Sequence, residues 1–280
     1  MAELRLIERI DQASGARASE DLFDRNAQAA WIFDGATGIV PDIIAGAPSD
    51  PHWLVHAVNA GLKAHWDDAA PTGDLLQAAA EHAIGRFEAE PSTPELPIID
   101  GPTACLLIAR LWQGRLQLTT LGDCWLLRSS GGRVTEFGRK PGDGAGPVGR
   151  EAARLRAAGV DGADLFERLL PLERQRRATA NTDRGYAIVD LSLRWVGRGH
   201  QETAPASTGD HLFLMTDGLY RLIDTFHVHD GRSLMNAALH GGVAPLLAQL
   251  RDLEAADEAC EAHPRGKVRD DVAAALLIID

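Results

Sequence analysis

The sequence predicts an α+β fold in which antiparallel strands are segregated from paired helices. The order of elements along the chain is strand, two helices, many strands, helix, strands, helix and strand, which is typical of a layered fold. Neighbouring strand-like segments joined by short turns favour antiparallel pairing. No linker divides the chain, and 280 residues are enough to bury a substantial core. We therefore expect residues 1–280 to form a single domain.

The first half of the chain alternates between clear helix and strand signals. The apolar run 29–33 predicts a buried strand that ends in a turn at 34–38. Ser49-Asp50-Pro51 has the cap residue and the early proline of a helix start, and Gly73-Asp74 opens a second helix. The proline-bearing segment 91–97 reads as a connector.

Short strands dominate the second half. We expect a loop at 138–149, because that segment is rich in glycine and proline. Helices are expected at 151–170 and 233–259, and strands at 104–109, 116–120, 125–127, 134–137, 186–193, 211–216 and 272–279.

Charge and apolar run length exclude several classes of function. The chain has 40 acidic and 28 basic residues and a net charge of −12, so we expect neither nucleic acid nor an anionic membrane as a partner. The longest apolar run, 272–279, is too short to span a bilayer, and the charged start resembles no signal peptide. The three cysteines form no C-x-x-C pair, and reduced, buried thiols indicate a cytoplasmic location.

Acidic residues recur at the ends of the predicted strands. Asp34, Asp123 and Asp217 each follow a strand and adjoin a glycine, whereas Asp270 precedes one. Carboxylates at strand ends are held rigidly, and Mg²⁺ and Mn²⁺ prefer such oxygen ligands. A turn is the competing interpretation for each position taken alone, because Asp-Gly is a common turn dipeptide.

Six short motifs occur in order over almost the whole chain. They are Arg17-Ala-Ser-Glu20-Asp21, Phe33-Asp34-Gly35-Ala-Thr-Gly38, Gly101-Pro-Thr-Ala104, Gly122-Asp123-Cys-Trp-Leu-Leu-Arg128, Leu214-Met-Thr-Asp217-Gly218-Leu-Tyr and Arg269-Asp270-Asp271. Because of these motifs and their order, the chain resembles the metal-dependent protein Ser/Thr phosphatases of type 2C, the PPM family, and in particular its bacterial members. The resemblance implies a four-layer αββα sandwich, with two antiparallel sheets flanked by helix pairs.

The resemblance also implies a site for two Mn²⁺ or Mg²⁺ ions. By position, Asp34 would bridge both ions, and Gly35 would offer its backbone carbonyl. Asp217 and Asp270 would ligate one ion, and Asp21 the other. The choice between Glu20 and Asp21 stays open, because the first motif is one residue shorter than the family pattern.

The implied reaction is hydrolysis of phosphoserine or phosphothreonine monoesters in a phosphorylated protein. A water that bridges the two ions is the nucleophile. Arg17 would hold the substrate phosphate, a task that suits the guanidinium fork. Asp123, with Asp217, would belong to a weaker third metal site.

Three positions depart from the family pattern. Ala36 stands where many members carry a histidine that could protonate the leaving group. Arg221 stands where an aspartate is frequent, so a cation there should weaken the third metal site. Asp271 replaces the closing asparagine and adds negative charge near the site.

Two other functions stay open on the sequence. Ala36 and Arg221 favour a weak or inactive phosphatase-like domain that binds a phosphopeptide or a partner. A small phosphoester is the other substrate class, since specificity would lie in surface loops. The oligomeric state is not predicted. His227 and His229 lack further ligands at zinc spacing and indicate a surface loop. The basic segment 173–177 indicates a solvated helix face, or a docking point for an acidic segment.

Overall fold

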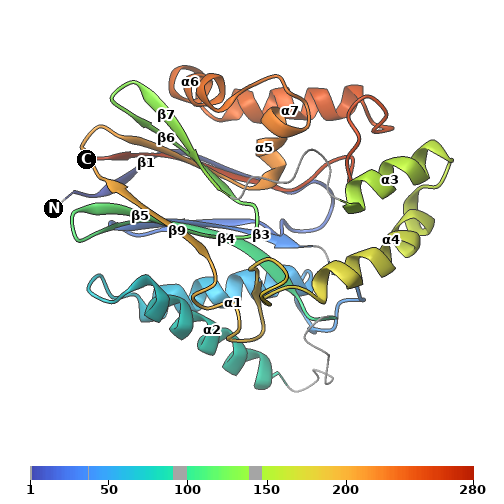
Figure 1. The fold of residues 1–280 in the computed structure, drawn as a ribbon, viewed down its shortest axis with the longest axis horizontal. Helices are drawn as coiled ribbons and strands as arrows, with labels where there is room; N and C mark the ends of the chain where they lie inside the picture. The colour runs from blue at the N-terminus through green and yellow to red at the C-terminus, as the bar shows by residue number, and fades with distance from the viewer. Residues whose placement is uncertain (1, 37, 91–99, 139–146) are drawn as a thin grey trace.

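Two antiparallel β-sheets lie face to face at the centre of the structure, with helices on both outer sides (Figure 1). This computed structural model describes residues 2–36, 38–90, 100–138 and 147–280. The arrangement confirms the predicted α+β class and the four-layer αββα sandwich.

Each sheet is built from strands that are distant in the sequence. In order across the first sheet, the strands are β1 (Leu4–Gln12), β11 (Val272–Ile279), β10 (His211–Met215), β6 (Trp125–Ser130) and β7 (Arg133–Phe137). In the second sheet they are β2 (Leu22–Arg25), β3 (Ala29–Ala36), β4 (Thr103–Trp112), β5 (Arg115–Leu121) and β9 (His200–Pro205), and the short β8 (Val189–Asp190) pairs with β4. All of these pairings are antiparallel.

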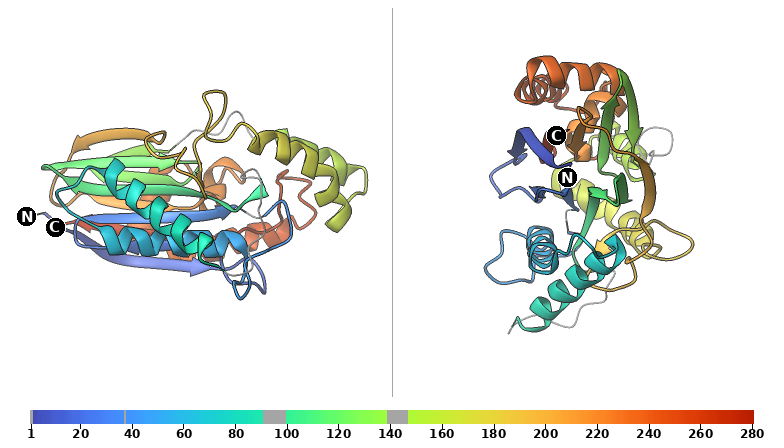
Figure 2. Two further views of the ribbon diagram at one scale, coloured as in Figure 1. Left: turned by 90° about the horizontal axis from the view of Figure 1, so that it is seen from below. Right: turned by 90° about the vertical axis from the view of Figure 1, so that its left-hand side faces the viewer.

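Helices form the two outer layers. The second sheet is covered by α1 (Asp50–His65) and α2 (Thr72–Glu88), which cross it in the view from below (Figure 2). The first sheet is covered by α5 (Asp217–Asp224), α6 (Gly231–Gly241) and α7 (Ala244–Ala256). A further pair, α3 (Pro147–Ala157) and α4 (Gly162–Arg177), lies at the end of the sandwich away from the chain termini (Figure 1).

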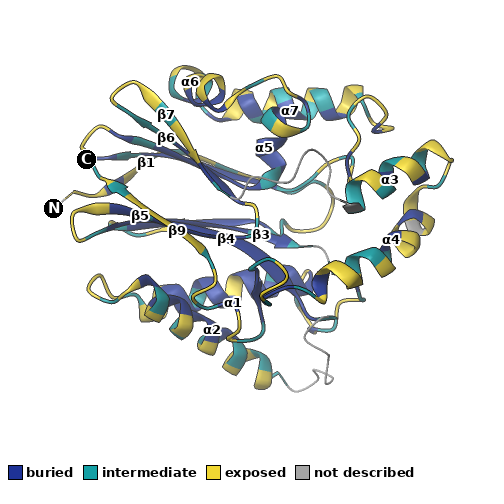
Figure 3. Cartoon of the chain, in the orientation of Figure 1, coloured by how far each residue is buried: buried dark blue, intermediate teal, exposed yellow. Residues whose placement is uncertain are grey.

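Strand β3 shows why the core forms in layers. Its side chains alternate: Ala30 and Ile32 pack between the two sheets, whereas Trp31 and Phe33 pack against the α1–α2 layer. Both faces are therefore buried, which explains the unbroken apolar run. Figure 3 shows the same division, with buried inner faces and exposed outer faces on the helices.

Several element boundaries follow the predicted signals. Helix α1 begins after Ser49, whose side chain accepts a hydrogen bond from the His52 amide at 3.3 Å. The predicted helix 233–259 is instead two helices, because Gly242 has a positive φ of 83° and ends α6. The predicted helix 151–170 is likewise divided between α3 and α4, which pack on each other.

Other predictions need correction or lie outside the described residues. Strands β1, β2 and β9 and helix α5 were not expected, and only Val189–Asp190 of the expected strand 186–193 is extended in a sheet. The connector 91–97 and residues 139–146 of the predicted loop lie outside the described residues, and Pro147 already begins α3. Within the described ranges, none of the helices combines the length and apolar composition needed to cross a bilayer.

Candidate metal centre

Antiparallel pairing gathers the predicted acidic residues at one end of the sandwich. The end of each strand lies beside the start of its neighbour, so residues that follow one strand meet residues that precede the next. Asp34 lies near the end of β3, Asp123 follows β5, and Asp217 follows β10. Asp21 immediately precedes β2, and Asp270 precedes β11. We call these five residues the carboxylate cluster.

Two glycines allow the segments of the cluster to approach closely. Gly35 donates its amide to the Glu20 carbonyl at 3.2 Å, and a Cβ atom at Gly35 would lie 2.6 Å from that oxygen. A Cβ atom at Gly218 would overlap the Asp271 carbonyl oxygen. Neither Asp-Gly pair is a turn: Asp34-Gly35 lies within β3, and Asp217-Gly218 begins α5. The turn interpretation is therefore wrong for both pairs.

Asp34 lies where the fields of the other carboxylates converge. Loss of hydration raises the pKa of its side chain well above the usual range, and the charges of Asp217, Asp21 and Asp123 raise it further. Asp217 has a pKa of about 7 for the same two reasons, first burial and then the neighbouring Asp270 and Asp123 carboxylates. A cation bound between these groups would relieve the repulsion.

Asp21 connects the two sheets. Its Oδ2 atom accepts hydrogen bonds from the Thr216 hydroxyl at 2.7 Å and from the Ala273 amide at 3.2 Å. Burial raises the pKa of this carboxyl well above its ordinary value, and the charges of Asp270 and Asp217 add to the rise. The neighbouring Glu20 contributes its backbone, through the contact with Gly35.

Asp270 differs from the other members because the chain already pairs it with two cations. The Arg221 Nη2 atom lies 2.6 Å from Asp270 Oδ2, and the Lys267 Nζ atom lies 2.9 Å from Oδ1. Burial alone would raise the pKa of Asp270, but Lys267 and Arg221 lower it below its usual value. Sequence reasoning placed Arg221 near a third metal, and it missed Lys267.

Asp271 holds the segment that carries the first motif. Its Oδ1 atom accepts a hydrogen bond from the Ser14 amide, and its Oδ2 atom accepts one from the Glu20 amide, both at 2.7 Å. The extra carboxylate oxygen therefore has a structural use, which the sequence alone did not reveal.

The remaining predicted site residues lie at the edge of the cluster. Asp123 is exposed, and its Oδ1 atom accepts a hydrogen bond from the buried Cys105 thiol at 2.9 Å. The side chain of Arg17 is 76% exposed and pairs with Asp42 at 3.3 Å. Among the described ion pairs, none joins Arg17 to the carboxylate cluster. The structure thus brings Asp21, Asp34, Asp123, Asp217 and Asp270 together and leaves Arg17 on the nearby surface.

The chemistry of the donors fits a hard divalent cation. Within the ranges that the structure describes, no three His, Cys, Asp or Glu side chains are already arranged as metal ligands. Oxygens of Asp21 and Asp270 are instead held by protein donors. The cluster nevertheless offers only oxygen ligands, and burial together with its like charges raises the pKa of Asp34 and Asp217. Mg²⁺ and Mn²⁺ prefer such oxygen ligands.

Other candidate residues lie outside this cluster. His227 contacts the Ile223 carbonyl, and His229 contacts the Gln249 side chain, each at 2.9 Å. Arg177 is buried and donates to the Gly101 carbonyl at 3.0 Å, so the expected solvated face at 173–177 is wrong at this residue.

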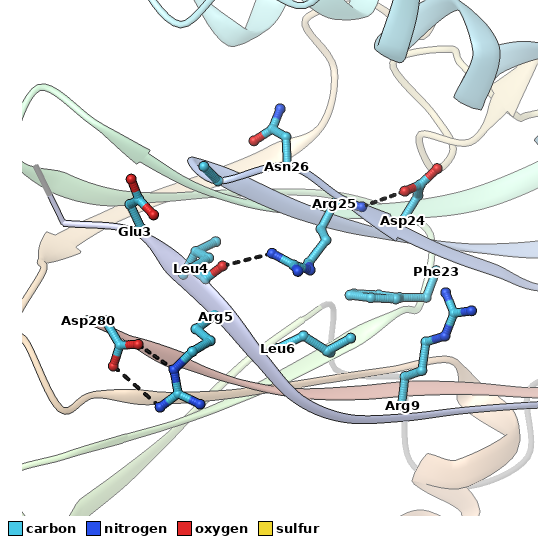
Figure 4. A pocket seen from close by; sticks show the side chains of 11 residues that line it. Glu3, Leu4, Arg5, Leu6, Arg9, Phe23, Asp24, Arg25, Asn26 and Asp280 are labelled. Atoms are coloured by element: carbon cyan, nitrogen blue, oxygen red, sulfur yellow. Dashed lines mark hydrogen bonds and ion pairs between the residues drawn. The ribbon is translucent and has the colours of Figure 1, made fainter.

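Pockets occur elsewhere on the molecule. One lies beside the chain termini, between β1 and β2, where Arg5 pairs with Asp280 and Arg25 donates to the Leu4 carbonyl at 3.1 Å (Figure 4). Another lies between α3 and α4. Neither is lined by a member of the carboxylate cluster.

No protein-family model matches the chain, and no curated protein matches it by sequence. Its fold does match solved structures. The catalytic domain of the serine/threonine phosphatase PstP, in complex with two manganese ions, is 18% identical, with a TM-score of 0.55 and coverage of 100% of this chain and 99% of that chain. The Mycobacterium tuberculosis phosphatase PstP/Ppp is 18% identical, with a TM-score of 0.56 and coverage of 99% of both chains.

A third match comes from another bacterium. PppA of Pseudomonas aeruginosa, described as a regulatory component of its T6SS, is 15% identical, with a TM-score of 0.53 and full coverage of both chains. At these identities the matches show the fold alone. The chain therefore has the fold of the PPM Ser/Thr phosphatases, as the order of its motifs predicts.

Proposed function

We propose that residues 1–280 form a single metal-dependent protein Ser/Thr phosphatase domain of type 2C, of the bacterial kind. Its substrates would be phosphoserine and phosphothreonine monoesters in proteins. The observation that supports this proposal best is the carboxylate cluster at one end of a PPM-type sandwich, where burial and neighbouring carboxylates raise the pKa of Asp34 and Asp217. We also propose a cytoplasmic location, since all three cysteines are buried free thiols.

Two divalent ions, Mn²⁺ or Mg²⁺, would occupy the cluster. The proposed ligands are the Asp34 carboxylate between both ions, the Gly35 carbonyl, Asp217 and Asp270 for one ion, Asp21 for the other, and Asp123 with Asp217 for a weak third. The likeness to a phosphatase solved with two manganese ions supports this assignment.

Other residues of the chain would bind the substrate phosphate and position the segment that binds it. When bound, divalent ions would activate a water nucleophile and neutralise phosphoryl charge. Arg17 would bind the substrate phosphate, and its exposed pair with Asp42 is weak enough to be exchanged for that phosphate. Asp271 positions the Arg17 segment through its two backbone contacts. Ala36 carries no proton donor, so this position would not protonate the leaving oxygen.

Hydrolysis assays test this proposal. An aryl phosphate and a phosphothreonine peptide would be incubated with Mn²⁺, Mg²⁺ or EDTA. We expect metal-dependent turnover that falls by about a hundredfold or more in Asp34→Asn and Asp217→Asn. Asp183→Asn is the matched control, because Asp183 is an exposed aspartate that pairs with Arg198. Unchanged turnover in Asp34→Asn would overturn the assignment of the site.

The second candidate is a phosphatase-like domain that binds a phosphopeptide or a partner without turnover. The cation pair at Asp270 and the alanine at position 36 favour it. Its signature would be tight phosphopeptide binding, measured by calorimetry, by folded, metal-loaded protein that hydrolyses neither substrate. Metal-dependent turnover would exclude it.

A further inference from the structure

Both carboxylate oxygens of Asp270 are already engaged by cations of this chain. Oδ2 pairs with Arg221 at 2.6 Å, and Oδ1 pairs with Lys267 at 2.9 Å. Asp270 is one of the two proposed ligands of a single ion. Each carboxylate oxygen has a second lone pair, so a divalent ion could still coordinate Asp270, but it would lie next to a positive charge unless one of these partners moves away.

The two cations differ in how firmly they are held. Arg221 is buried and also pairs with Glu254 at 3.3 Å, a side chain with no exposed surface. Arg251 contacts the same Glu254 at 2.6 Å and donates to the Asp270 carbonyl at 3.0 Å. Moving Arg221 would break two ion pairs of a buried guanidinium, one to Glu254 and one to Asp270, which is costly. Arg221 is therefore a fixed part of the site.

Lys267 is the cation that is free to move. Its side chain is 47% exposed, and among the described contacts its one ion pair is with Asp270. That pair brings its Nζ atom to within 2.9 Å of Oδ1 of Asp270, a member of the carboxylate cluster. Lys267 can leave Asp270 for solvent without breaking a buried network.

We propose that Lys267, backed by the fixed Arg221, competes with a divalent ion for Asp270, so that the two ions bind unequally. The first ion binds where Asp34, Gly35 and Asp21 meet, and the second, at Asp34, Asp217 and Asp270, binds tightly only when the Lys267 ammonium moves away. This inference rests on the proposed function, because it concerns the same metal site. It makes occupancy of the second position depend on the available metal concentration.

Calorimetric titration with Mn²⁺ tests the inference without any substrate. In the unaltered chain we expect a tight first ion and a second that binds about tenfold or more weaker, as an adjacent like charge demands. Lys267→Met removes the charge and keeps an unbranched side chain one atom shorter, so the second ion should bind about tenfold tighter. Lys267→Arg should retain the weak second ion.

Lys63→Met is the matched control. Lys63 is similarly exposed and pairs with an aspartate, Asp24, at 2.8 Å, but that pair lies outside the carboxylate cluster. We expect Lys63→Met to leave the affinities for both Mn²⁺ ions unchanged. Electron paramagnetic resonance provides a second readout, since two neighbouring Mn²⁺ ions give an exchange-coupled spectrum. In Lys267→Met this spectrum should be complete near two ions per chain, whereas the unaltered chain should need excess Mn²⁺.

The outcomes separate this inference from the proposed function. The competition would be overturned if both Mn²⁺ ions bound the unaltered chain with equal affinity. It would also be overturned if the affinity for the second ion did not change in Lys267→Met. Neither result would contradict the phosphatase proposal. Absence of Mn²⁺ binding in every folded variant would overturn both proposals.

Discussion

The carboxylates of the cluster repel one another, and this repulsion sets how single residues behave. Burial and the acidic neighbours together raise the pKa values of Asp34 and Asp217. Asp270 is the exception, because Arg221 and Lys267 balance its charge. The same end of the sandwich therefore contains one carboxylate, Asp270, whose charge is balanced by side chains of the protein, and others whose charges a bound cation could balance.

Replacing Asp34 by asparagine should separate metal binding from folding. Asp34→Asn removes one of the mutually repelling charges, so we expect the metal-free variant to melt a few degrees above the unaltered chain, at about 2–4 °C per kcal/mol. The rise in melting temperature on adding Mn²⁺ should disappear. Thermal denaturation with Mn²⁺ or EDTA measures both effects. A full Mn²⁺-induced rise in the variant would show that Asp34 is not a ligand.

Both carboxylate oxygens of Asp271 should contribute to the stability of the fold. Asp271→Ala loses the hydrogen bonds to the Ser14 and Glu20 amides, whereas Asp271→Asn keeps one acceptor. We expect the alanine variant to lower the free energy of unfolding by about 1–3 kcal/mol and the asparagine variant by less. Urea denaturation gives this comparison. If both variants are as stable as the unaltered chain, the two contacts contribute little; if both lose stability equally, the acceptor that asparagine keeps contributes little.

At the scale of elements, glycines control how closely the strand ends approach. Gly35→Ala and Gly218→Ala place a methyl group against the Glu20 and Asp271 carbonyls, so each should destabilise the fold by about 1–3 kcal/mol. Gly85→Ala, inside α2 with open space around it, is the control and should stabilise by about 0.5–1 kcal/mol. Equal effects at the three positions, measured by denaturation, would refute this explanation.

The buried elements were predictable because their signals are local. Strand β3 is a continuous apolar run, and α1 begins with a side-chain cap. Strand β9 lacked such a signal, since it is an edge strand with mostly exposed polar residues. Strand β1 is also an edge strand, and its exposed Ile7 followed by the half-buried Glu8 hides the apolar alternation in the sequence, although burial alternates along the strand.

The acidic members of the site were predictable, but their partners were not. The motifs identify Asp21, Asp34, Asp123, Asp217 and Asp270 by their order in the sequence. The pairing of Lys267 and Arg221 with Asp270 depends on how a loop, a helix and a strand end meet in space. The spacing of residues in the sequence therefore does not predict these two ion pairs.

At the scale of the whole molecule, folding gathers like charges at one end, and this should make stability depend on pH. An unfolded aspartate has a pKa of about 3.9, whereas Asp217 in the fold has a pKa of about 7. Because the folded value is the higher one, the stability contributed by Asp217 is complete below about pH 4 and is lost as the pH rises toward 7.

The metal-free chain should therefore lose stability between about pH 4 and pH 7 more steeply than Asp217→Asn does, and added Mn²⁺ should stabilise it more at pH 8 than at pH 5.5. Melting temperatures across this range, with EDTA or Mn²⁺, provide the test. An identical pH profile for both chains would contradict the raised pKa of Asp217.

The location of Mn²⁺ in crystals of the protein tests the central claim most directly. Anomalous diffraction from crystals soaked in Mn²⁺ would show where the ion binds. We predict a strong peak within coordination distance of Asp34 and Asp21, and a weaker peak between Asp34 and Asp270 that grows with Mn²⁺ concentration. Peaks only outside the carboxylate cluster, or none beside Asp34 at saturating Mn²⁺, would contradict the assignment of this cluster as the metal centre of a phosphatase.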